Sequence, residues 1–351
     1  MSEIVYVGMD LGTSRTSITT STGIRTTVWS YVGYAQDHVS KKLLGGRDKV
    51  FGEEAVENRM SVNLVRPLDK GVIRDEVDAK RATRDLIEHI IELAEIPSGS
   101  TVYGVIGAPA EASVDSKAHI LEAASEFMDS IIVCSEPFSV AYGLDFLADT
   151  LVIDIGAGTV DLCRVHGTMP KAEDQRTHHF GGDAIDQKLF DLISEKYTEA
   201  QFSTNMVREI KENFANVGRQ HDSVLATFPV KGKPTEFDVT DQVHEACMGI
   251  VQPTIEALQD LIATYDPEFQ QKMRNHILLG GGGSQITGLA RAMEEALVEY
   301  GGGKVKAVEE PQYAGSNGAL KVALDMPIEF WEEFVLATAG NMKNILAIVL
   351  L

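Results

Sequence analysis

The sequence predicts an α/β protein of two similar domains, each built on a mixed sheet flanked by helices. Three observations predict this class. Strand-like apolar runs alternate with helical patterns along the chain. A glycine turn between acidic residues follows an apolar strand once in each half. With 351 residues, 44% of them hydrophobic, the chain is long enough for two domains with substantial cores.

The first half begins with a predicted antiparallel meander. The apolar run 4–7 leads into the acidic turn, and two further strand patterns flank Thr22-Gly23. Residues from about 33 to 75 are rich in charge and glycine without long periodicity, which predicts a small inserted subdomain. Strands and helices then alternate up to about residue 145.

The second half repeats this order of parts. The run 150–153 enters the second acidic turn, and a strand, a turn at Gly167 and another strand follow. A second insertion of helices and a hairpin is expected at about 184–245. The helical pattern after it passes through Pro253, where we expect a kink. Residues 277–279 form a strand pattern that enters a third glycine turn.

These patterns predict the domain boundaries. Domain I comprises residues 1–145 plus about 312–351, and domain II comprises residues 146–311.

Charge and cysteine content restrict the function classes. The net charge is −21, from 52 acidic and 31 basic residues, which opposes binding to nucleic acid or to an anionic membrane. The three cysteines lie far apart in apolar contexts without metal-ligand spacing. We expect buried thiols and a reducing cytosol.

The two ends of the chain differ. The first strand pattern starts within a few residues of the N-terminus, so neither a signal peptide nor an amphipathic anchor is expected there. The apolar run 344–351 is too short to span a bilayer. Four interpretations of this run stay open: docking on the protein itself, covering a groove of a partner, touching a membrane edge, or a segment foreign to the natural chain.

The two acidic turns carry the chemistry. Asp10 and Asp154 end their strands, and small or hydroxyl residues follow each of them. Small residues let backbone N–H groups approach an anion, and a carboxylate at a strand end can hold a hydrated Mg²⁺. Two such turns predict a clamp on a polyphosphate. A P-loop is excluded because Val305 follows Lys304 where a hydroxyl residue is required.

The duplicated acidic turn with a later glycine cluster resembles the actin, sugar kinase and Hsp70 superfamily of ATPases. The resemblance implies an actin-like fold that holds ATP or ADP with Mg²⁺ in a cleft between the two domains. It implies that Asp10 and Asp154 hold Mg²⁺ through water. It places the phosphates on Gly12, Thr13 and Ser14 at the β-phosphate and on Gly156, Ala157, Gly158 and Thr159 at the γ-phosphate.

The resemblance also implies contacts to the rest of the nucleotide. Asp183 is expected to cap a helix whose free N–H groups favour anions near the ribose and phosphates, together with Gly181 and Gly182. A helix from about residue 205 is similar to the actin helix that lies along the adenosine. The expected contacts are Arg208, Lys211 and Glu212 on that helix, and Gly281, Gly282, Gly283 and Ser284 against the adenine.

Two acidic residues are implied in ATP hydrolysis. Asp161 would help to order the attacking water, and Glu136, at the start of a helix, would position water for attack on the γ-phosphate. The structural alternative for Glu136 is a first-turn acid favoured by the helix dipole, worth about 0.3–1 kcal/mol. Both interpretations can hold together.

Local sequences narrow the resemblance to bacterial actin-like proteins whose filaments organise magnetosomes. The matching stretches are 32–34, 42–45, 52–55, 135–138, 142–145 and 167–175. The resemblance runs from about residue 4 to about 334, and several of these stretches lie outside the nucleotide turns. Residues 66–68 and 71–73 instead resemble the MreB cell-shape actins.

The function that follows is an ATP-dependent polymerising protein, a cytoplasmic ATPase whose filaments position magnetosomes alongside their membranes. The implied partners are further copies of itself and magnetosome-associated adaptor proteins, with no nucleic acid and no direct transmembrane insertion. The alternatives are an MreB-like cell-shape scaffold and a non-polymerising small-molecule kinase of the same fold.

Overall fold

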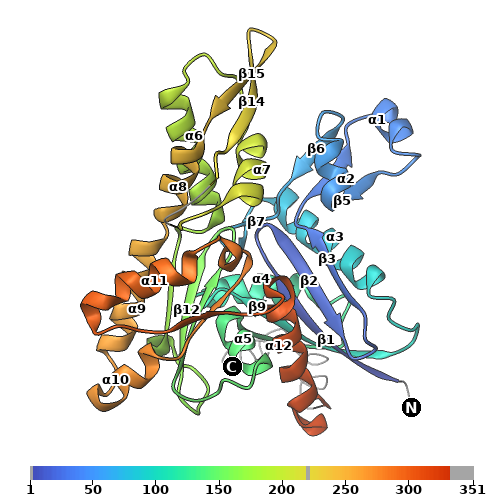
Figure 1. The fold of residues 1–351 in the computed structure, drawn as a ribbon. Helices are drawn as coiled ribbons and strands as arrows, with labels where there is room; N and C mark the ends of the chain where they lie inside the picture. Colours follow the sequence, from blue (N-terminus) through green and yellow to red (C-terminus); the bar gives the residue numbers. More distant parts are fainter. Residues whose placement is uncertain (1–2, 219–221, 333–351) are drawn as a thin grey trace.

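The computed structural model of the chain describes residues 3–218 and 222–332. Two domains lie side by side (Figure 1). The apolar run 344–351, and the part of predicted domain I beyond residue 332, lie outside the described residues.

Domain I is built on a sheet with the strand order β10-β9-β1-β2-β3. β1 is antiparallel to β2 and parallel to β9, and β9 is parallel to β10. In this register Asp10 at the end of β1 lies opposite Ser17 on β2. The strands are β1 (Ile4–Leu11), β2 (Arg15–Thr20), β3 (Arg25–Trp29), β9 (Thr101–Ala108) and β10 (Ser130–Ser135).

Domain II repeats this sheet with the order β17-β16-β11-β12-β13. β11 is antiparallel to β12 and parallel to β16, as β1 is to β2 and β9. Asp154 on β11 lies opposite Asp161 on β12. The strands are β11 (Thr150–Ile155), β12 (Val160–Val165), β13 (Gln175–His178), β16 (Ile277–Gly280) and β17 (Val305–Ala307). The prediction of two similar α/β domains with mixed sheets is therefore confirmed.

Alternating side chains on the strands bury both faces of each sheet. One face of β1 carries Val5 and Val7, which pack with Leu86 of α3 (Val77–Leu93) and Ile120 of α4 (Val114–Ala124). The other face of the same sheet carries Tyr103 and belongs to a core that both domains share.

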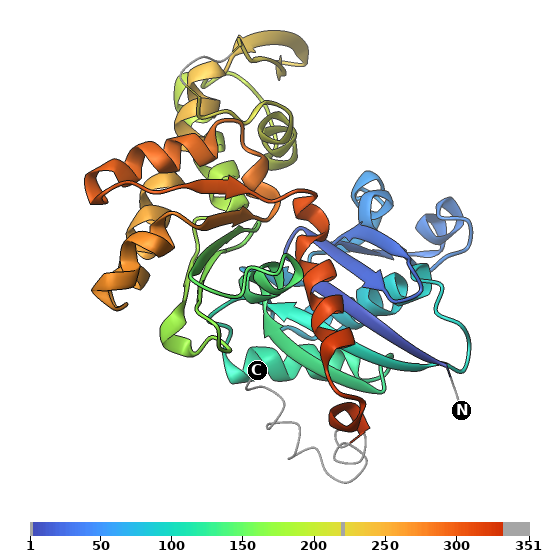
Figure 2. The same cartoon turned by 60° about the horizontal axis from the view of Figure 1, so that its bottom comes forward.

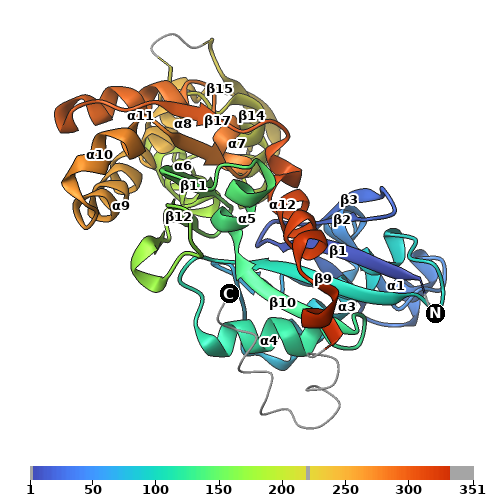
Figure 3. The ribbon, with the colours of Figure 1, turned by 90° about the horizontal axis from the view of Figure 1, so that it is seen from below.

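The shared core is filled by two helices. α5 (Glu136–Gly143) leads from β10 into domain II, and α12 (Pro311–Asp325) returns from β17 to lie along the sheet of domain I, as Figure 2 shows. Seen from below, the two helices lie side by side between the sheets (Figure 3). Their contact needs glycine, because a Cβ atom at Gly318 would lie 1.8 Å from the Ser139 carbonyl oxygen.

The end of the described chain is anchored on domain I. Trp331 is completely buried and stacks on Tyr103, with ring centroids 5.0 Å apart and planes 2° from parallel. Tyr6 completes this aromatic cluster at 6.5 Å from Trp331.

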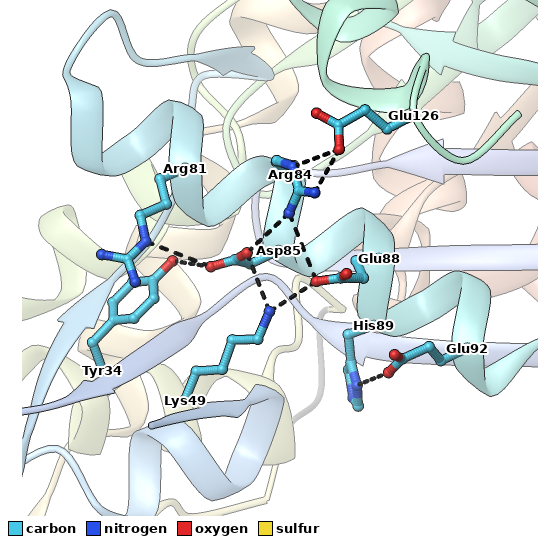
Figure 4. Close-up of polar contacts among 9 residues, drawn as sticks. All are labelled: Tyr34, Lys49, Arg81, Arg84, Asp85, Glu88, His89, Glu92 and Glu126. Atoms are coloured by element: carbon cyan, nitrogen blue, oxygen red, sulfur yellow. Dashed lines mark hydrogen bonds and ion pairs between the residues drawn. The ribbon is translucent and has the colours of Figure 1, made fainter. Parts of the chain in front are cut away.

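The insertion in domain I is a small sheet with the order β5-β4-β6. Its elements are β4 (Val32–Ala35), α1 (His38–Leu43), β5 (Lys49–Phe51), α2 (Gly52–Glu57) and β6 (Val62–Val65), followed by the short pair β7 (Leu68–Asp69) and β8 (Val72–Ile73). Figure 4 shows how polar side chains tie this sheet to α3. The buried Asp85 carboxylate accepts hydrogen bonds from Tyr34 Oη at 2.7 Å and Lys49 Nζ at 3.2 Å. This contact fixes the small sheet to domain I.

The insertion in domain II contains helices and a hairpin. Its elements are α6 (Gly182–Lys196), α7 (Thr204–Phe214), β14 (Leu225–Val230), β15 (Lys233–Asp238) and α8 (Thr240–Met248). The predicted kink at Pro253 is displaced. α8 ends before Gly249, and Pro253 lies in the first turn of α9 (Val251–Ala263), where its missing N–H removes no helical hydrogen bond.

The remaining elements cover domain II. α10 (Pro267–Arg274) and α11 (Leu289–Leu297) flank the glycine cluster that follows β16. All three cysteines are free and buried, as expected. Among the described residues, no helix is long and apolar enough to cross a membrane. The domain boundaries drawn from the sequence stay predictions.

Candidate nucleotide-binding site

The two acidic turns come from different domains and touch each other. A Cβ atom at Gly158 would lie 2.7 Å from Thr13 Oγ1 and 2.6 Å from the Lys70 Cα. Thr13 Oγ1 also accepts a hydrogen bond of 2.7 Å from the Gly71 amide, in the turn between β7 and β8. Only glycine at position 158 allows the domains to approach this closely.

The second turn is joined to the start of α6. The amides of Gly182 and Asp183 donate to the carbonyls of Gly156 and Ala157, at 3.0 and 2.8 Å. Gly181, and not Asp183, is the residue that precedes the helix, so the predicted cap was wrong. The amides of Gly182 and Asp183 were expected to be free for an anion, but both are used in these hydrogen bonds. A contact of residues 181–183 with a nucleotide stays a prediction.

Four carboxyl groups converge on the floor between the turns: Asp10, Glu136, Asp154 and Asp161. Burial, and less strongly the charge of the nearby Asp161, raise the pKa of Asp10 to about 6. Burial and the charges of Asp10 and Asp161 also raise the pKa of Glu136 and of Asp154. Each domain therefore contributes acidic groups to one electrostatic cluster.

The position of Glu136 follows from its elements. It is the first residue of α5, directly after β10, and it faces Gly107 of the neighbouring β9, where a Cβ atom would lie 3.1 Å from Glu136 Cγ. The same added atom would lie 3.9 Å from the Asp10 Cα. Glu136 thus lies beside the first acidic turn, and its role in positioning water stays a prediction.

Asp161 is held by donors from both domains. Its Oδ1 accepts hydrogen bonds from the Ala110 amide at 2.7 Å and the Thr177 hydroxyl at 2.6 Å. Burial raises the pKa of Asp161, while hydrogen bonds from Thr159, Thr177 and the Ala110 amide oppose that rise. Its orientation is therefore fixed.

The donor set fits a hydrated cation. Buried carboxylates that repel each other are stabilised by a divalent ion, and Mg²⁺ usually keeps several waters in its shell. In residues 3–218 and 222–332, no three His, Cys, Asp or Glu side chains form a direct metal-ligand group. A magnesium ion held through water by Asp10 and Asp154 stays a prediction.

On α7, the three residues expected along the adenosine have different environments. Lys211 Nζ donates to the Gly182 carbonyl at 3.0 Å and pairs with Asp186 at 2.7 Å, so it braces the start of α6. Glu212 is exposed to solvent. Arg208 pairs with Asp186 at 3.1 Å.

The glycine cluster after β16 adjoins the acidic floor. A Cβ atom at Gly281 would lie 2.2 Å from Asp154 Oδ1, and one at Gly283 would lie 2.1 Å from Ile155 Cγ2. Gly282 faces open space. Ser284 Oγ donates to the Gly281 carbonyl at 2.7 Å. Glycines 281 and 283 are thus required by packing, and Gly282 is the one with room for a ligand.

The sequence did not predict the contacts across the cleft. Arg66 of domain I pairs with Asp183 of domain II at 2.7 Å, and Tyr31 accepts a hydrogen bond of 2.8 Å from Arg208. We call these four side chains the cross-cleft contact. The sequence 66–73 stood out only by its resemblance to MreB, and nothing in it indicated a partner on α6.

A cavity of about 240 Å³ lies beyond the end of α7, lined by residues that include Phe214, Val243 and Thr287. None of the residues predicted to bind nucleotide lines it. The facing turns and their acidic floor therefore form the candidate site.

Two domains of the same topology, with facing turns over a shared acidic floor, define an actin-like protein of the superfamily that includes actin, sugar kinases and Hsp70. The chain belongs to the MreB/Mbl family, whose model, described as MreB/Mbl protein, matches residues 5–327.

Within this family the chain is similar to MamK. It is 39% identical to the actin-like protein MamK of Magnetospirillum gryphiswaldense over 93% of this chain and 91% of that protein. The MamK of Paramagnetospirillum magneticum is 38% identical over 94% and 95% of the two chains. The resemblance to magnetosome actins is thereby confirmed.

Solved structures agree with this assignment. A MamK double helical filament superposes with a TM-score of 0.90 at 38% identity, covering 93% of this chain and all of that one. A non-polymerising MamK mutant bound to AMPPNP matches with a TM-score of 0.71 at 37% identity, with the same coverage. The ADP-bound MreB5 of Spiroplasma citri, at 17% identity and a TM-score of 0.75, shares the fold.

Proposed function

We propose that the chain is an ATP-dependent bacterial actin that polymerises into cytoplasmic filaments. The observation that carries this proposal is the contact between the two acidic turns above a floor of four buried carboxyl groups, in a chain that resembles MamK over nine-tenths of its length. MamK forms a double helical filament, and a non-polymerising MamK mutant binds AMPPNP, which supports the same properties here.

ATP binding would close the two domains and favour head-to-tail association of subunits. Such heterologous contacts form open filaments and do not close into rings. The added positive charge of Mg²⁺ would neutralise charge on the phosphates and on the acidic floor. Asp10 and Asp154 would hold this ion through its water ligands.

Hydrolysis would follow in the assembled subunit. A water molecule oriented by Glu136 and Asp161 forms a bond to the γ-phosphorus, and the bond to the bridging oxygen breaks. The electron pair of that bond leaves with ADP, and the water proton passes to a carboxylate or to solvent. Release of phosphate would weaken the filament contacts and permit turnover.

The biological role we propose is positioning of magnetosomes, with adaptor proteins linking the filament to their membranes. An MreB-like cell-shape scaffold is the second candidate. It is favoured by the match to the MreB/Mbl family model and by residues 66–73, which contact the first acidic turn through Gly71 and Thr13.

Sedimentation tests the central proposal. The purified chain is expected to pellet with MgATP, to stay in the supernatant without nucleotide or with EDTA, and to release phosphate. Electron microscopy of the pellet should show filaments. ATP consumption without sedimentation, stimulated by added sugars or acids, would identify a small-molecule kinase and refute the proposal. Restored magnetosome alignment in a mamK deletion strain would separate the two filament roles.

A further inference from the structure

The loop after β9 joins domain I to the edge strand of domain II. Residues 109–113 leave the sheet of domain I, and β13 is the edge strand of the other sheet. The Ala110 amide crosses this boundary to donate to Asp161. The loop therefore touches a residue that the proposed hydrolysis uses.

Thr177 of β13 completes the junction through three hydrogen bonds. Its hydroxyl donates to Asp161 Oδ1 at 2.6 Å and accepts from the Glu111 amide at 3.1 Å. Its own amide donates to Glu111 Oε2 at 2.7 Å. The single hydroxyl proton is donated to Asp161, and a lone pair of the same oxygen accepts from the Glu111 amide of domain I.

Domain I has a threonine at the position equivalent to Thr177, but its contacts differ. The position equivalent to Asp161 on β12 is Ser17 on β2, and the residue paired with it is Thr27 on β3. The Thr27 hydroxyl donates to the Thr16 carbonyl at 3.2 Å and holds no carboxylate. Both domains carry the threonine, but only in domain II does it orient an acid.

We propose that Thr177 is a positioning residue that, together with Glu111, makes the orientation of Asp161 depend on closure of the two domains. Opening of the cleft at this point would withdraw Ala110 and Glu111 together. Asp161 would lose the amide donor and Thr177 its anchor, so hydrolysis would proceed only in the closed subunit. This inference rests on the proposed ATPase function.

The test compares three variants with the unmodified full-length chain. Thr177→Val removes the hydroxyl and keeps the shape of the side chain, Thr177→Ser restores the hydroxyl, and Thr27→Val is the matched change in domain I. A further variant, Glu111→Ala, removes the acceptor of the Thr177 amide and leaves the hydroxyl in place. The readouts are steady-state phosphate release, binding of a fluorescent ATP analogue and the Tm.

Thr177→Val is expected to lower kcat about 10- to 100-fold, as for loss of one hydrogen bond to a charged group, with analogue binding within about twofold of the original. Thr177→Ser should recover most of kcat, and Thr27→Val should keep it. Glu111→Ala should lower kcat by a smaller factor.

Three outcomes would overturn the inference. An unchanged kcat in Thr177→Val removes the positioning role, and an unchanged kcat in Glu111→Ala removes the link to domain closure. Parallel losses of kcat and of analogue binding would show a structural role only. Absence of hydrolysis by the unmodified chain would instead overturn both the inference and the proposed function.

Discussion

Each of the four acids on the cleft floor has a distinct environment. Asp161 is held by donors from both domains, whereas Glu136 begins a helix and faces a glycine on the neighbouring strand. Fixed carboxylates lower the reorganisation that a water molecule needs before it attacks. The roles of these two acids can therefore be separated from nucleotide binding.

Replacement of either acid should slow hydrolysis and spare binding. Glu136→Ala and Asp161→Ala are expected to reduce phosphate release about 100-fold or more, because each removes a group that orients water. Filaments formed with MgATP should then persist, as measured by the time course of light scattering. Normal phosphate release in both variants would contradict the assignment. Glu299→Ala, at an exposed acid away from the acidic floor, serves as the control and should keep the original rate.

His178 provides a prediction for pH. Its Nδ1 accepts a hydrogen bond from the Phe180 amide at 3.3 Å, and its Nε2 lies 3.2 Å from Thr254 Oγ1, whose own proton goes to the Ile250 carbonyl. These partners require a neutral ring. Burial, and less strongly the neighbouring His179, lower the pKa of His178 to about 4.

A lowered histidine pKa makes the folded state bind fewer protons than the unfolded state below about pH 6.5. The contribution of His178 to the free energy of unfolding should therefore fall as the pH drops from about 6.5 to 4, by about 2 kcal/mol after allowance for partial exposure. Urea titrations across this range measure the slope. His178→Gln should remove this contribution and so change the slope relative to the unmodified chain, and the exposed control His276→Gln should leave the slope unchanged. Equal slopes in both variants would refute the prediction.

Among the elements, the contact between α5 and α12 depends most on residue size. Gly318→Ala would put a methyl group 1.8 Å from the Ser139 carbonyl oxygen. The clash is with the backbone of α5, which cannot move away without disturbing the helix. We expect a loss of about 3 kcal/mol or more in the free energy of unfolding. Leu324→Ala, an exposed change on the same helix, should cost less than about 0.5 kcal/mol. Similar costs for the two variants would contradict this packing argument.

The sequence predicted the strand, turn and strand around Asp10 and Asp154 because the apolar runs, small residues and acids are adjacent in the chain. It could not predict the partners of Thr177 or Arg66, since these lie 66 and 117 positions away and meet only when two domains pack. The helix break was assigned to Pro253, yet the first turn of a helix tolerates proline, and the break falls at Gly249.

For the molecule as a whole, the cross-cleft contact should govern nucleotide exchange. Arg66 and Asp183 are about three-quarters buried, so their ion pair contributes more than an exposed one. Arg66→Ala is expected to raise the release rate of a fluorescent ADP analogue about 5- to 30-fold, as for a loss of 1–2 kcal/mol. The exposed pair of Arg291 and Glu295 offers the control, and Arg291→Ala should release the analogue at the original rate. Equal release rates in the two variants would show that this contact does not restrain the cleft.

Both tryptophans of the chain, Trp29 and Trp331, lie on domain I: one on its edge strand and the other stacked against Tyr103. Intrinsic indole emission thus reports mainly on domain I. Circular dichroism reports on both halves. In a thermal melt, a loss of circular dichroism at a lower temperature than the change in fluorescence would show that domain II unfolds while domain I stays folded.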